Sequence, residues 1–136
     1  MRALIVTGLL LASTAAAAQE VSVGTGDWSA YPAVQERGEL RMSDQLMDRI
    51  EQIAAERVCS NVEGLGPTAV DISVPFMIRY KQDGTVEHIV LKHLGCPALE
   101  TTLGATVLQM ARAGQYRPAE LGRDGWYRGE ISFANR

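Results

Sequence analysis

The two cysteines and two histidines are the residues of this sequence with the widest choice of chemistry: Cys59, His88, His93 and Cys96. Thiolate and imidazole groups are the usual ligands of zinc, but the spacing here fits no compact zinc motif. A reactive thiolate at Cys96 is a second option, although the chain has no Cys-x-x-Cys pair. We predict instead a disulfide between Cys59 and Cys96, and neither a metal site nor a cofactor.

Patterns for other kinds of catalysis are weak. No serine lies in a Gly-x-Ser-x-Gly turn, and Gly24-Thr25-Gly26 lacks the remaining glycine of a phosphate-binding loop. Carboxylate pairs such as Asp44 and Asp48 fit a solvated helix face better than an acid and base pair. We therefore expect no catalytic residues and a protein that is not an enzyme.

The first eighteen residues have the layout of a secretory signal peptide. Arg2 supplies a positive start, an apolar run follows from Leu4 to Ala12, and Ala15–Ala18 provide small residues before a cut. We expect cleavage after Ala18 and export to the periplasm, where an even number of cysteines usually means pairing. The alternative is an anchor retained in the membrane, for which the apolar run is short.

Cleavage would leave residues 19–136, with 12 basic and 16 acidic residues and a net charge of −4. A chain of that length is one domain that can bury a core of its own. Nucleic acid and anionic membrane surfaces are not expected partners, because both are bound through clustered Lys and Arg.

Hydrophobic spacing predicts an extended arm over residues 19–42, followed by two helices on either side of a hairpin. Ser43 is the expected N-cap of a helix over 43–58, and Pro97 suits the first position of a helix that ends at Gly114. Cys59 then follows the first helix and Cys96 precedes the second. Two antiparallel helices on one sheet face would bring these ends together.

Between the helices, apolar residues alternate from Val70 to Tyr80, with Pro75 indicating a bulge or a free edge. Gln82-Asp83-Gly84 is the expected hairpin turn, and the returning strand over 85–92 needs a bulge near Glu87 or His88 to keep one apolar face.

A last strand is expected from Trp126 to Ala134. The predicted fold of residues 43–136 is an α+β two-layer sandwich in the order α-β-β-α-β. It has a three-stranded antiparallel sheet with two helices on one face.

Four pieces of sequence between Val74 and Phe133 resemble the C-terminal domain of TonB and its relative TolA, periplasmic proteins that reach from the inner membrane to outer-membrane receptors. They are Asp83–Val86 at the hairpin, Gly95 with Leu99-Glu100 at the second helix, Gln115–Ala119 after it, and Gly122 with Tyr127–Phe133 in the last strand.

The resemblance implies that a partner peptide adds a strand beside the last strand of the sheet. Carried over by position, the contact residues would be Tyr127, Arg128, Glu130 and Ser132, although an ordinary exposed strand face is the simpler explanation of them. The expected partner is an envelope protein or an outer-membrane receptor peptide, and the same edge would allow two copies to form a homodimer.

This sequence also departs from the TonB pattern, because it has no long Pro-rich span. It could be a membrane-anchored energy transducer only if residues 1–18 are retained. A small secreted enzyme or enzyme inhibitor on the same scaffold is the other alternative.

Overall fold

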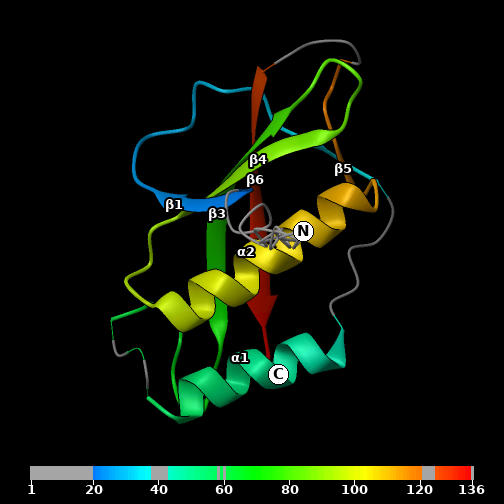
Figure 1. Ribbon diagram of the computed structural model, residues 1–136. Helices are drawn as coiled ribbons and strands as arrows, with labels where there is room; N and C mark the ends of the chain where they lie inside the picture. The colour runs from blue at the N-terminus through cyan, green and yellow to red at the C-terminus, as the bar shows by residue number, and fades with distance from the viewer. Residues whose placement is uncertain (1–19, 38–42, 58, 60, 121–124, 136) are drawn as a thin grey trace, which may run out of the picture.

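The computed structural model describes residues 20–37, 43–57, 59, 61–120 and 125–135 (Figure 1). The expected signal peptide, its cleavage site and the last part of the expected arm lie outside these residues. The elements are, in chain order, β1 (Val21–Gly24), β2 (Gln35–Glu36), α1 (Asp44–Ala55), β3 (Asp71–Tyr80), β4 (Val86–Lys92), α2 (Pro97–Arg112), β5 (Tyr116–Arg117) and β6 (Gly125–Ala134).

The main sheet is mixed and has the strand order β1-β4-β3-β6. The central strand β3 is antiparallel to both β4 and β6, while β1 runs parallel to β4. β2 and β5 form a separate antiparallel pair. The prediction of a three-stranded antiparallel sheet is therefore wrong.

The strand of the main sheet that the prediction missed is β1, at the start of the expected arm, and the short pair of β2 and β5 was not predicted either. β1 is held by the edge of β4, because the Ile89 N–H donates to the Glu20 carbonyl and the His93 N–H donates to the Gly24 carbonyl. Val21 also packs against α2 at Gly104, where an added Cβ would lie 2.6 Å from a Val21 methyl group. Four residues are too few for a periodic pattern, so only the tertiary contacts define this strand.

Both helices lie on the same face of the main sheet (Figure 1). Alternate residues of β3 face them, and Ile72, Phe76 and Ile78 are at most 3% exposed. Ile50 and Ile53 of α1 and Leu99, Leu103 and Val107 of α2 complete this core. Ser43 caps α1 through a hydrogen bond from the Leu46 N–H, and Pro97 begins α2, as their types predict.

The hairpin contains the expected bulge. The register moves from Arg79 opposite His88 to Tyr80 opposite Val86, so Glu87 is the extra residue of β4. Pro75 lies on a central strand rather than at a bulge or on an edge strand. It pairs with Glu130 of β6, while the pairing of β3 with β4 stops at Phe76, so no partner on β4 needs a Pro75 N–H.

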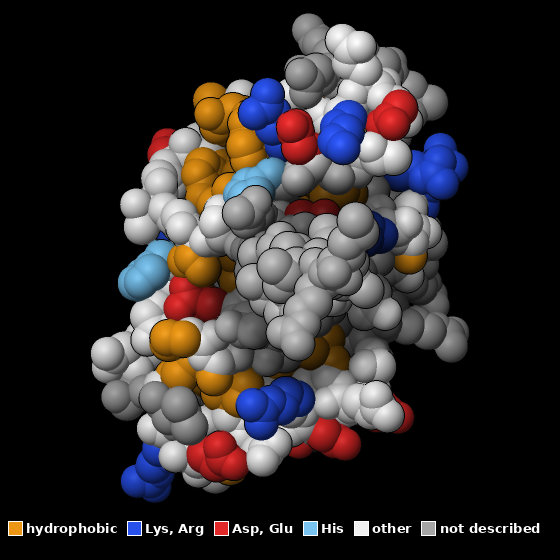
Figure 2. Space-filling view, in the orientation of Figure 1, with side chains coloured by type: hydrophobic (Ala, Val, Ile, Leu, Met, Phe, Trp, Pro, Cys, Tyr) orange, Lys and Arg blue, Asp and Glu red, His pale blue; other side chains and the backbone are white. Residues whose placement is uncertain are grey.

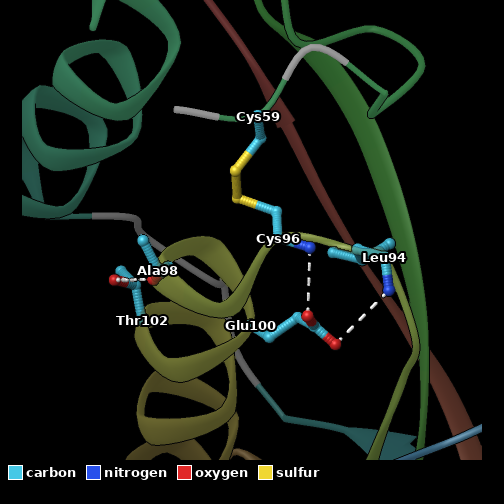
Figure 3. The surroundings of a disulfide bond; sticks show 6 residues. All are labelled: Cys59, Leu94, Cys96, Ala98, Glu100 and Thr102. Atoms are coloured by element: carbon cyan, nitrogen blue, oxygen red, sulfur yellow. Dashed lines mark hydrogen bonds between the residues drawn. A yellow bond between two sulfur atoms is a disulfide. The ribbon is translucent and has the colours of Figure 1, made fainter. Parts of the chain in front are cut away.

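The predicted disulfide joins Cys59 to Cys96, with their Cα atoms 5.5 Å apart. Figure 3 shows that Glu100 supports the turn beside it. Its carboxylate accepts the Cys96 N–H at 3.1 Å and the Leu94 N–H at 3.4 Å. Glu100 is 7% exposed, so these contacts provide the hydrogen bonds that a buried carboxylate needs.

The disulfide indicates an oxidising, exported location. No helix within the described ranges is long and apolar enough to span a membrane.

Acidic and basic side chains lie next to one another over the β3–β4 hairpin (Figure 2), where Arg79 and Glu87 form an ion pair at 3.2 Å.

Candidate functional site

The candidate residues lie on β6, the strand at one end of the main sheet. Their side chains do not share one face. Tyr127 is 3% exposed and packs edge-on against Tyr80 in the core, with ring centroids 5.6 Å apart. Arg128, Glu130 and Ser132 are exposed on the face opposite the helices. The folded protein therefore offers three of the four predicted side chains to a partner.

The backbone N–H and C=O groups of β6 also alternate in direction, because in an antiparallel pair only every second residue forms hydrogen bonds with the neighbouring strand. Asn135 donates its N–H to the Val70 carbonyl on the β3 side. Arg128 instead uses its N–H and C=O on the outer side. The even-numbered residues of β6 therefore direct their backbone groups away from the sheet.

One part of this outer edge is occupied by the chain itself. The Arg128 N–H donates to the Pro32 carbonyl and the Val34 N–H donates to the Arg128 carbonyl, each at 2.8 Å. Ala33 and Arg128 thereby form an isolated parallel bridge. The Arg128 side chain adds a third hydrogen bond, from Nε to the Tyr31 carbonyl at 2.8 Å.

The rest of the edge, from Glu130 to Ala134, has no strand paired with it among the described residues. By the alternation above, the N–H and C=O groups of Glu130, Ser132 and Ala134 point outward there. Unpaired groups of this kind are a template for an incoming extended segment. We call Glu130–Ala134 the open edge.

A row of polar side chains borders the open edge on the face opposite the helices. The Ser73 hydroxyl of β3 donates to the Glu130 carboxylate, and its oxygen lies 3.0 Å from the Ser132 hydroxyl oxygen. These contacts hold Glu130 and Ser132 in place beside the strand. A partner side chain on this face would meet one carboxylate and two hydroxyl groups.

A hollow of about 430 Å³ lies next to this row, beneath the segment that connects β1 to β2. Trp28 and Pro75 provide apolar lining, Lys92 and Arg128 are basic, and Glu36 and Glu130 are acidic. Asp27 also lines the hollow, and hydrogen bonds from Ser29 lower the pKa of its carboxyl. The surface beside the open edge can thus contact both charged and aromatic groups.

The sequence patterns do not indicate that Pro32, Val34 or Ser73 belongs to this site. Pro32 and Val34 lie in the expected arm, and their partner is almost a hundred residues away in the sequence. Ser73 reaches the site only through the pairing of β3 with β6. The alternation in β3 places Ser73 opposite the core but does not name its neighbour.

The residues considered for metal or thiol chemistry do not lie on β6, and they make other contacts. The disulfide uses both thiols, so Cys96 is not a reactive thiolate in this state. The Nε2 atom of His88 lies 2.8 Å from the Ser22 hydroxyl oxygen across the pairing of β4 with β1. The His93 backbone bonds Gly24, and its side chain is exposed.

These features define a disulfide-linked α+β domain whose mixed sheet has one edge partly covered by the chain itself. No family model, no curated protein and no solved structure matches this chain.

Proposed function

We propose that this chain is a periplasmic protein-binding module, similar to the C-terminal domain of TonB and TolA, that takes up an extended segment of another envelope protein. The segment adds as a strand to the open edge, Glu130–Ala134. The observation that carries the proposal is this run of outward backbone groups, which no strand in the described part of the chain pairs.

The surroundings of the open edge support the same function. Three outward residues offer up to six backbone hydrogen bonds, which give affinity without a sequence requirement. Glu130, Ser132 and the hollow beside them then give specificity. Export is supported by the disulfide, and periplasmic location by the layout of residues 1–18.

Two variants at one position test strand addition. Ser132→Pro removes an outward N–H that bonds nothing in the described chain, and proline is tolerated at such a position of an edge strand. Ser132→Ala removes only the hydroxyl group and keeps the N–H. Both proteins are used to capture partners from an envelope extract, after circular dichroism has shown unchanged folding.

We expect Ser132→Ala, which keeps the backbone N–H and loses one hydroxyl contact, to weaken capture of a specific wild-type partner only modestly, and Ser132→Pro to abolish it. Equal capture by Ser132→Pro and the wild type would contradict strand addition at the open edge.

A further inference from the structure

The segment Tyr31–Val34, which we call the internal strand, already shows how an extended chain binds β6. It runs parallel to β6 at the bridge between Ala33 and Arg128. Its carbonyl groups at Tyr31 and Pro32 accept hydrogen bonds from Arg128, and its Val34 N–H donates to the same residue. The outward backbone groups of Arg128 are thus already paired with a segment of the same chain.

A notch in β6 receives one side chain of the internal strand. A Cβ atom at Gly129 would lie 2.4 Å from Phe76 Cζ and 3.0 Å from Val34 Cγ2. Only glycine therefore leaves room for both side chains. Val34 is partly buried and packs against the core, while Tyr31, Pro32 and Ala33 are exposed. The notch selects an aliphatic side chain at this one position.

The internal strand is held by few contacts. Three hydrogen bonds and one partly buried side chain attach it to β6, and the two-residue pairing of β2 with β5 follows it. Segments with so little buried apolar area open locally at low free energy, without unfolding of the core.

We propose that the internal strand is a substitute for part of the partner, which displaces it. In the free protein it closes the edge at Arg128 and fills the Gly129 notch. A partner segment that runs parallel to β6 and carries an aliphatic residue for the notch then extends its pairing from the open edge to Arg128. This inference rests on the proposed function, because it assumes that β6 is the edge that binds.

A synthetic nonapeptide with the sequence of residues 29–37, Ser-Ala-Tyr-Pro-Ala-Val-Gln-Glu-Arg, serves as the probe. It is titrated into the ¹⁵N-labelled full mature chain, and the backbone amide signals of Arg128 and Gly129 are followed. Val34→Asp empties the notch but keeps the N–H at this position. Gln35→Asp introduces the same charge at the exposed neighbouring residue and leaves Val34 in place.

We expect the peptide to bind the Val34→Asp protein at least tenfold more tightly than the wild type or the Gln35→Asp protein, with shifts at Arg128 and Gly129. A peptide carrying its own V34D change should bind the Val34→Asp protein at least tenfold more weakly. If Val34→Asp does not fold, Val34→Ala replaces it, with the same order of affinities expected. Equal affinity for variant and wild type, or shifts elsewhere, would overturn the proposal.

The outcomes separate this inference from the proposed function, because the titration contains no envelope protein. If the peptide does not bind while Ser132→Pro abolishes partner capture, the open edge binds but the internal strand is a fixed part of the fold. If the peptide binds as expected while Ser132→Pro captures normally, the notch is real but the partner does not use the open edge.

Discussion

Val34 donates its backbone N–H to the carbonyl oxygen of Arg128 at 2.8 Å, and this hydrogen bond joins the first part of the described chain to its last strand. It divides the outer edge of β6 into a part that the protein closes itself and the open edge, which no strand of the described residues pairs. Exposed sheet edges favour unwanted pairing, and natural proteins commonly cover or shorten them. Within the part of the chain that the structure describes, the covering stops at Arg128, so the open edge is short.

The disulfide should contribute a large share of the stability. Cys59 and Cys96 are separated by 37 residues in the sequence. Closing a loop of this length lowers the conformational entropy of the unfolded chain, which stabilises the folded state by at most about 4 kcal/mol. We expect the Cys59→Ser/Cys96→Ser double variant to lose up to about 4 kcal/mol of unfolding free energy, measured by urea denaturation. Two reactive thiols in the native wild type would contradict the pairing.

Gly129 should tolerate no side chain. A methyl group there would meet Phe76, which is 0% exposed and cannot move without disturbing the core. We expect Gly129→Ala to lower the unfolding free energy by about 1–3 kcal/mol. Gly125→Ala in the same strand is the matched control, since no atom of the described residues beyond its chain neighbours lies within 4 Å of the added Cβ, and stability should be unchanged or slightly raised. Similar stabilities of the two variants would show that the notch is not tightly packed.

Tyr116 should make stability sensitive to alkaline pH. Burial is the main cause that raises the pKa of its hydroxyl from 10.0 to about 12, and the nearby Glu36 carboxylate adds to it. Because the folded protein holds this proton more tightly than the unfolded chain, the stabilising contribution is complete below pH 10. It is lost as the pH rises toward 12. Tyr80, whose pKa burial also raises, should contribute in the same direction.

Tyr116→Phe tests this effect. The hydroxyl has no hydrogen-bond partner among the described residues, so its removal should leave stability at pH 7 within about 1 kcal/mol of the wild type, or higher. Between pH 10 and 12 the variant should lose less stability than the wild type in urea denaturation. Tyr31→Phe, at a residue 41% exposed, should change neither the stability at pH 7 nor the stability lost between pH 10 and 12. An unchanged pH dependence in Tyr116→Phe would contradict the assignment.

Local signals in the sequence predicted much of residues 43–135 but not the complete sheet. Ser43 and Pro97 determine helix starts, and Gly84 a turn, through contacts and backbone angles within a few residues of their own positions. The helix starts and the hairpin turn could therefore be placed from the sequence. The bulge at Glu87 followed from apolar residues of opposite parity on β4. β1 is different, because its four residues become a strand only beside β4 and against Gly104.

The candidate site was predictable to a similar extent. The position of β6 in the sequence and the exposure of Arg128, Glu130 and Ser132 follow from alternation with buried Ile131 and Phe133. The same alternation places Tyr127 in the core, which the transfer of contact residues by resemblance did not take into account. The closure by Pro32 and Val34 depends on contacts between distant segments, which no local pattern contains.

Amide hydrogen exchange of the free protein tests most directly whether β6 ends in an open edge. The N–H groups of Glu130 and Ser132 should exchange quickly, those of Ile131 and Phe133 should be protected by β3, and that of Arg128 should have intermediate protection because the internal strand opens locally. This alternation is the predicted result. Protection of Glu130 and Ser132 equal to that of Ile131 would show that the edge is already covered and would contradict the account.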